Sequence, residues 1–286
     1  MSDPEDQAGV PLIESISDSD SPAPTKTKSN KRKRETEDDA EAKKAARKAR
    51  RKAKKPQDID DTTLDSDKGI NTGVAQMDSR LMADHLAQRT KRYQPDLSLV
   101  EAEDWRLPES SIADSTGFEK DRVTDNLPEF LEHFAVKKSG KKGSKGDGVS
   151  WSPKEKGSPH TLVVTGAGLR AADLTRALRK FQTKDAKVAK LFAKHIKMEE
   201  AVQQLKKDRV NIGVGTPQRI MDLLDDGALS AGKLDRIVVD ASHIDQKKRG
   251  VLDMKELQIP LVKLLTRKQF KEKYGSGDGK IELLFY

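Results

Sequence analysis

The pattern of apolar positions is clearest toward the C-terminal end of the 286-residue chain, where short apolar runs alternate with segments of helical periodicity. Runs rich in Val, Leu and Ile predict buried strands; they occupy residues 161–166, 210–215, 234–242 and 281–286. Helices are predicted over residues 171–182, 217–224 and 253–266, the last with Pro260 as a kink or a start. Residues 187–197 suit either a strand or a helix. This alternation predicts an α/β fold with one parallel sheet and helices on both faces.

Upstream of residue 159 the apolar pattern is less regular. Residues 76–93 place apolar side chains at helical spacing, with Asp78 and Ser79 as a start signal. Residues 94–136 mix apolar positions with prolines, so we expect 76–136 to be a helical or extended arm that packs on the domain or on a partner. Residues 137–158 are rich in Gly, Ser and Lys and predict a flexible loop, in which Trp151 is a candidate anchor. The folded domain is expected over residues 159–286.

The first 75 residues predict a disordered tail, acidic and then basic. Residues 1–24 contain acids and no base, and Ser15 and Ser17 each precede an acid by three positions. That spacing suits phosphorylation, although an inert acidic tail explains it equally well. Two basic clusters follow within residues 31–55 and match a bipartite nuclear localisation signal or an RNA-binding segment. The residues of this signal are Lys31, Arg32, Lys33, Arg34, Arg50, Arg51, Lys52, Lys54 and Lys55.

Composition narrows the choice of function. Charged residues make up 36% of the chain and aromatic residues 4%, which fits one modest domain plus extended chain. The net charge of +8 favours nucleic acid or another polyanion as a partner over simple solubility. The chain has no cysteine, which excludes disulfides and cysteine-based zinc sites. It also has neither an apolar run of about 20 residues nor a signal peptide, so we expect no membrane partner and no secretion.

Motifs for enzymatic chemistry are weak. The phosphate-binding pattern G-x-x-x-x-G-K-S/T does not occur, and the Gly-rich residues 275–280 precede a strand instead of following one. Residues 166–171 match G-x-G-x-x-A, but a basic stretch stands where an acidic ribose ligand would be needed. The five histidines show no close ligand spacing. We therefore expect no cofactor, metal or small-molecule substrate; a divergent nucleotide-binding enzyme is the alternative.

A more specific signal lies at residues 213–219, GVGTPQR. Thr216 can cap a helix whose first residue is Pro217. The free N–H groups of such a helix start attract phosphate, and Arg219 adds a positive charge. A well-capped helix explains the same residues without any ligand.

Three segments together resemble the first RecA-like lobe of DEAD-box RNA helicases. LVVTGAGLRAADL resembles the strand and turn of motif Ia, with Arg170 matching its arginine, and GTPQR resembles the T-P-G-R motif, with Gln218 in place of Gly. VVDASHID resembles the end of the D-E-A-D strand, where Asp240 matches but Ala241 replaces the glutamate. The resemblance implies a single RecA-like (P-loop-NTPase-like) sheet that lacks the ATPase machinery.

Residues 76–286 are closer still to the Cms-type proteins of the early small-subunit pre-ribosome. The blocks that carry this resemblance are VVTGAGLRAADLTRALRKF, KLFAKHIK, GVGTPQRIMDLL and LDRIVVDASHIDQKKRG. It implies a non-catalytic nuclear and nucleolar factor in rRNA processing, with pre-rRNA and early small-subunit assembly factors as partners.

The helicase resemblance also implies a nucleic-acid-binding surface that follows an RNA backbone. Carried over to this chain, it consists of Gly166, Arg170, Thr216, Pro217 and Arg219, which Lys194 and Lys197 would extend. The alternative is a protein-docking scaffold that touches RNA only through its basic tail.

Overall fold

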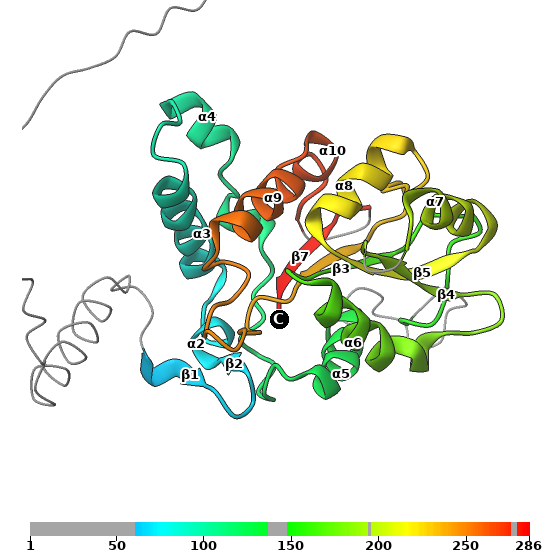
Figure 1. Ribbon diagram of the computed structural model, residues 1–286, viewed down its shortest axis with the longest axis horizontal. Coiled ribbons are helices and arrows are strands. Elements are labelled where there is room, and N and C mark those ends of the chain that lie inside the picture. The colour runs from blue at the N-terminus through cyan, green and yellow to red at the C-terminus, as the bar shows by residue number, and fades with distance from the viewer. Residues whose placement is uncertain (1–60, 137–147, 194–195, 276–278) are drawn as a thin grey trace, which may run out of the picture. The chain divides into compact units, whose positions relative to one another are not determined.

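Five parallel strands form the central sheet, in the order β4–β5–β3–β6–β7 (Figure 1). A computed structural model describes residues 61–136, 148–193, 196–275 and 279–286. The strands are β3 (Thr161–Val164), β4 (Lys187–Leu191), β5 (Val210–Gly215), β6 (Arg236–Val239) and β7 (Glu282–Phe285). The three central strands, β5, β3 and β6, are buried along their whole length, as expected for strands covered on both faces. The four predicted strands and the parallel sheet are confirmed, and the ambiguous segment begins as a strand.

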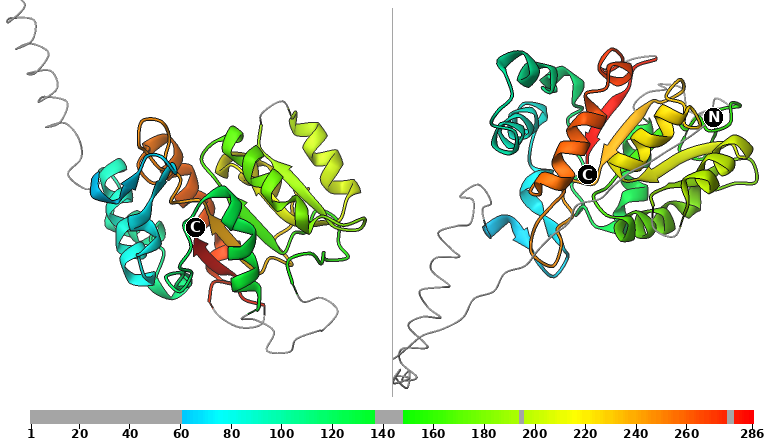
Figure 2. Two further views of the ribbon diagram at one scale, coloured as in Figure 1. Left: turned by 90° about the horizontal axis from the view of Figure 1, so that it is seen from below. Right: turned by 45° about the horizontal axis from the view of Figure 1, so that its top comes forward.

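Helices cover both faces of the sheet, as predicted (Figures 1 and 2). On one face, α5 (Leu127–Val136) and α6 (Gly168–Leu178) pack their apolar side chains against Val163, Val214 and Val238. The other face packs against α3 (Ser79–Tyr93), α7 (Met198–Lys207), α8 (Pro217–Asp226) and α9 (Lys255–Leu265). Sequence analysis did not predict α7, whose buried positions are only Ala201 and Leu205. Pro260 lies inside α9 and does not start it.

Residues 61–75, which were expected to belong to the disordered tail, form structured elements. These elements are the 3-10 turn η1 (Asp61–Thr63), the paired strands β1 (Leu64–Asp65) and β2 (Ile70–Asn71), and α2 (Thr72–Ala75). Ile70 is 2% exposed and pairs with His243, and the Asn71 amide donates to the Ser242 carbonyl at 2.7 Å. The expectation was wrong for these residues because their partners lie far along the chain. The remaining tail, residues 1–60, lies outside the described residues.

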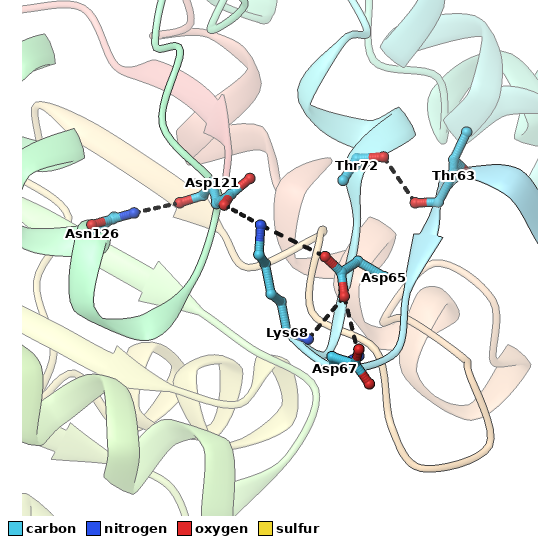
Figure 3. Close-up of polar contacts among 7 residues, drawn as sticks. All are labelled: Thr63, Asp65, Asp67, Lys68, Thr72, Asp121 and Asn126. Atoms are coloured by element: carbon cyan, nitrogen blue, oxygen red, sulfur yellow. Dashed lines mark hydrogen bonds and ion pairs between the residues drawn. The ribbon is translucent and has the colours of Figure 1, made fainter.

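The tip of this hairpin is tied to the segment that precedes α5 (Figure 3). The Lys68 ammonium donates to the Asp121 carboxylate at 2.7 Å and also approaches Asp65. The hydrogen bond and charge of Asp121 raise the pKa of Lys68. Asn126 in the 3-10 turn η3 (Thr124–Asn126) donates to the Asp121 carbonyl at 2.9 Å. The hairpin is thus joined to the arm.

The arm packs on its own domain, which settles the alternative left open by the sequence. After α4 (Leu99–Asp104) and the 3-10 turn η2 (Glu109–Ser111), the chain runs along the outer edge of β7. Ile112 pairs with Leu283, the Ala113 amide donates to the Leu283 carbonyl at 2.8 Å, and the Ser115 hydroxyl donates to the Phe285 carbonyl at 3.0 Å. These bonds cover an edge that would otherwise expose unpaired backbone groups.

Beyond β7, aromatic and cationic side chains join the arm to the sheet. Arg122 is 1% exposed and its guanidinium lies 4.8 Å from the Phe130 ring centre and 5.7 Å from that of Tyr286. Burial lowers the pKa of Arg122 to about 10, although the nearby Tyr286 opposes the shift. The Tyr286 hydroxyl donates to the Val123 carbonyl at 2.5 Å. The arm is therefore part of the hydrophobic core and not an appendage.

Trp151 anchors the end of the predicted flexible loop. Its ring stacks on the buried His160 ring, with centres 5.3 Å apart and planes 15° apart. Arg209 donates to the carbonyls of Ser152 and Pro153 at 2.8 and 3.0 Å. Residues 148–158 are thus held on the domain, whereas residues 137–147 lie outside the described residues.

Candidate nucleic-acid interface

A buried ion pair occupies the carboxyl edge of the sheet, between the ends of β3 and β6. The Arg170 Nε and Nη2 atoms each donate to one oxygen of Asp240, both at 2.9 Å. Thr165 donates a third hydrogen bond to the same carboxylate at 2.7 Å, and the Arg170 Nη1 atom donates to the Thr124 hydroxyl. Asp240 is 2% exposed and Arg170 9%. This two-pronged geometry is among the strongest that arginine and carboxylate form.

The ion pair changes the role expected of Arg170. Burial alone would lower the pKa of Arg170, but the hydrogen bonds and charge of Asp240 outweigh it and raise that pKa. The printed bonds to Asp240 and Thr124 engage three of the five guanidinium N–H groups. The residue therefore stabilises the edge of the sheet, and its contact with phosphate stays a prediction.

Gly166 follows β3 and is half-buried at the same edge. A Cβ atom at this position would lie 2.7 Å from the Leu257 side chain of α9. The close atom is a terminal methyl group that can shift, so packing against α9 disfavours a larger side chain without requiring glycine. A ligand contact by Gly166 stays a prediction.

The predicted helix start at residue 217 is confirmed. Thr216 is the extended residue before α8, and Pro217 is buried in the first helical turn. The Thr216 side chain makes no capping hydrogen bond, so its hydroxyl does not satisfy the first amides of the helix. Gly215, just before it, is required because a Cβ would lie 2.0 Å from the Leu191 carbonyl oxygen. Amide donors at a helix start can hold an anion.

Arg219 and Lys197 lie near one another at the starts of α8 and α7. The Arg219 Nη2 atom donates to the Ile196 carbonyl at 3.3 Å and its Nη1 atom lies 3.6 Å from the Met198 sulfur. Lys197, the residue between those two, is exposed. The structure thus brings Arg219, Lys197 and the start of α8 together. Lys194 lies outside the described residues.

Two partners of the buried pair were missed by sequence analysis. Thr165 follows β3 directly, and the carboxyl ends of neighbouring parallel strands meet at one edge. That rule was sufficient to predict its proximity to Asp240. Thr124 comes from the arm and gives no sequence signal, because its contact with Arg170 depends on how the arm folds back.

Little space remains beside the end of β6. The hairpin, α3 and the residues after β6 enclose a cavity of about 150 Å³, lined by Asn71, His85 and Ala241 among others. Arg89 and Asp253 form a buried ion pair in its wall, 3.0 Å apart. Ligand pockets usually measure about 300–1,000 Å³.

Within the described ranges, no helix is long and apolar enough to cross a membrane.

The parallel sheet, its strand order and the helical layers on its two faces define an α/β domain. The chain belongs to the CMS1 family, described as a U3-containing 90S pre-ribosomal complex subunit, whose profile matches residues 25–286. This membership confirms the resemblance found in the sequence.

Named relatives agree with this assignment. Protein CMS1 of Chaetomium thermophilum is 55% identical over 237 residues, which cover 83% of this chain and 91% of that protein. Protein cms1 of Schizosaccharomyces pombe is 30% identical over 205 residues, which cover 72% of this chain and 69% of that protein. Protein CMSS1 of Homo sapiens is 35% identical over 161 residues, or 56% of this chain and 54% of that protein.

Solved structures show only distant likeness. The yeast DEAD-box splicing factor Prp28 has a TM-score of 0.38 at 14% identity, covering 67% of this chain and 52% of that chain. A DEAD box protein from Methanococcus jannaschii has a TM-score of 0.31 at 16% identity, covering 50% and 37%. Scores this low support no conclusion about the function of this chain.

Proposed function

We propose that this chain is a non-catalytic ribosome biogenesis factor that binds RNA within the early small-subunit pre-ribosome. Membership of a family of pre-ribosomal subunits supports the process. The single observation that carries the non-catalytic part is the Arg170–Asp240 ion pair. Asp240 is the one acid that matches the helicase D-E-A-D strand, and both its oxygens accept hydrogen bonds in a buried site.

Other features support the same reading. Phosphoryl transfer needs a phosphate cradle and a metal held by acids. The sequence has no G-x-x-x-x-G-K-S/T pattern, and Ala241 replaces the second acid. The hairpin at residues 61–71 leaves only a small cavity beside β6. Purified full chain should therefore hydrolyse no ATP above background, with or without RNA.

The RNA surface in this proposal is the group at the starts of α7 and α8. Arg219 and Lys197 supply charge there, Thr216 and Pro217 place the amides of the helix start, and Gly166 lines the neighbouring turn. Arg170 stabilises the sheet edge through its ion pair with Asp240, and its proposed contact with phosphate would come from a side chain that is only 9% exposed. The basic clusters within residues 31–55 would add affinity because they are linked to the same chain.

A nuclear and nucleolar location follows from this function. The proposed import signal at Lys31–Arg34 and Arg50–Lys55 lies outside the described residues, so its role rests on sequence alone. Replacing both clusters with alanine should leave a fluorescently tagged full chain in the cytoplasm. Unchanged nucleolar fluorescence would show that import depends on another segment or on a partner.

Crosslinking in cells followed by RNA sequencing tests the RNA surface. The variant Lys197→Glu/Arg219→Glu should lose discrete pre-rRNA crosslinks at equal expression. The matched control, Lys247→Glu/Lys255→Glu, reverses two exposed lysines elsewhere and should retain them. Crosslinks that persist in the first variant and map to residues 31–55 would limit RNA contact to the tail.

Two exposed apolar side chains on α4 favour protein docking as a second function. Leu99 and Val100, which are consecutive in the chain, are 91% and 74% exposed. Exposed apolar groups of this kind mark protein interaction sites when they gather on one surface. The change Leu99→Ser/Val100→Ser should reduce co-purification of early assembly factors without affecting RNA crosslinks, and intact co-purification would remove this candidate.

A further inference from the structure

A basic groove runs along the outer edge of β4, away from the Arg170–Asp240 pair. It consists of two adjoining hollows of about 710 and 430 Å³, between α6, the 3-10 turn η4 (Arg179–Phe181) and β4. Both hollows are lined by Thr175, Arg179 and Lys190, so they form one continuous surface. In Figure 1, β4 lies at the end of the sheet opposite β7.

The groove concentrates positive charge, and most of its cations lie without an acidic partner among the described residues. No Asp or Glu lines either hollow, and the cationic side chains that line them are Arg176, Arg179, Lys184, Lys187 and Lys190. Arg176 pairs with Asp173, and Lys180 just outside the groove pairs with Glu132. The other four groove cations form no salt bridge among the described residues. Gathered like charges repel one another, and a bound polyanion would relieve that repulsion.

Protection of a sheet edge explains only part of this arrangement. Lysines on an edge strand discourage pairing with other chains, and Lys187 and Lys190 fit that role. They are three positions apart, which in a regular strand would point them to opposite faces. The register with β5 shifts between Lys187 and Val188, and both lysines line the same groove. Arg179 and Lys184 lie outside the strand, so edge protection does not account for them.

We propose that this groove binds the phosphate backbone of single-stranded RNA, an inference that rests on the proposed RNA-binding function. Gln182, Thr183 and Gln204 supply neutral hydrogen-bonding groups beside the groove cations. The aromatic rings nearby, Phe181 and Phe192, are each only 4% exposed and offer no face for base stacking. Charge without stacking or base-reading groups binds backbone with little sequence preference.

The groove is continuous with the starts of α7 and α8. Its second hollow is lined by Ile196, whose carbonyl accepts the hydrogen bond from Arg219. Lys197 follows directly in the chain. An RNA strand that contacts Arg219 and Lys197 can therefore continue past Lys190 and Arg179 along β4, which lengthens the binding track beyond the helicase-like motifs.

Salt-dependent binding of a fluorescein-labelled oligouridylate to the full chain tests this track. The variant Lys184→Gln/Lys187→Gln/Lys190→Gln should weaken binding and reduce the slope of log affinity against log salt by about 2, since each phosphate contact on a single strand contributes about 0.7. The control Lys247→Gln/Lys255→Gln/Lys268→Gln removes the same charge from exposed positions elsewhere and should keep the slope. Equal thermal midpoints would establish that both variants are folded.

Three results would overturn the groove. The first is that the groove and control variants give the same slope of log affinity against log salt, while Lys197→Glu/Arg219→Glu weakens binding. The proposed function would then stand without the groove. The second is no oligouridylate binding by the unmodified full chain, which would remove the proposed function as well. The third is that the groove variant loses binding to a labelled oligoglutamate but still binds oligouridylate as the unmodified chain does. The groove would then be a site for acidic proteins.

Discussion

The two edges of the central sheet differ in how the chain treats them. At β7, residues 112–115 of the arm pair with the strand and cover its backbone groups. At β4 no described strand pairs with the outer side, and lysines line a groove instead. Charged groups follow the same division. Arg170 and Asp240 pair with each other in the interior, whereas Lys184, Lys187 and Lys190 form no salt bridge with any acid in the part of the chain that the structure describes. The comparison separates charge that stabilises the fold from charge that is available to a ligand.

The largest expected effect comes from breaking the interior pair. Asp240→Asn leaves the buried Arg170 guanidinium without its counter-charge and should destabilise the protein by about 3–5 kcal/mol. Urea denaturation followed by circular dichroism measures this loss. The control Asp225→Asn removes an exposed partner of Arg267 and should leave the midpoint nearly unchanged. Equal midpoints for the two variants would mean that the interior charges do not stabilise the fold.

A buried histidine extends the comparison to proton uptake. Burial, assisted by the charge of Arg236, lowers the pKa of His160 from 6.5 to about 4. Between pH 6.5 and 4 the unfolded chain binds the proton and the folded chain does not. The free energy of unfolding should therefore decrease by roughly 3 kcal/mol as the pH is lowered from 6.5 to 4. Unfolding free energies measured across it should fall less steeply in His160→Gln. Parallel pH profiles for the two proteins would contradict the assignment.

The covered edge can be weakened without touching a charge. Ile112 is 7% exposed beside β7, and Ile112→Ala should cost about 2 kcal/mol of unfolding free energy. Leu99→Ala is the matched control, because Leu99 is 91% exposed and its truncation should stay within about 0.5 kcal/mol. If denaturation gives the same value for both, residues 112–115 do not stabilise the β7 edge.

The smallest expected effect is the change in thermal midpoint when ATP or oligouridylate is added to the full chain. ATP with Mg²⁺ should not raise the thermal midpoint of the full chain, because stabilisation requires binding to the folded state. Oligouridylate should raise it measurably at low salt. A thermal midpoint that rises with ATP but not with oligouridylate would contradict the comparison, because the chain would then bind the nucleotide and not the RNA.

The sequence predicted those elements whose signals lie within a few neighbouring residues. Apolar runs located the strands of the sheet, and Thr216–Pro217 located the start of α8. The pairing of Ile70 with His243 and of Ile112 with Leu283 was not predictable, because each joins residues that are distant in the chain and share no pattern. Residues 61–75 were consequently assigned to the tail.

The candidate site shows the same limit. The motif resemblance located Arg170, Thr216 and Arg219, but it gave no information on which charges are already paired. Arg170 is neutralised by Asp240, a residue 70 positions away. The groove cations lie in a helix, a turn, a loop and a strand, and no motif marked them as neighbours. Pairing and clustering of charges are properties of the folded chain.

The arm's pairing with the last strand has a consequence for synthesis of the protein. The Ser115 hydroxyl bonds to Phe285, 170 residues later. At about 5–20 residues per second, residues 112–115 wait roughly ten to thirty seconds on the ribosome before β7 is made. Throughout that time Phe118, Phe130 and the rest of the arm's apolar side chains lack their partner Tyr286. The nascent chain therefore has a defined period in which chaperone binding would matter most.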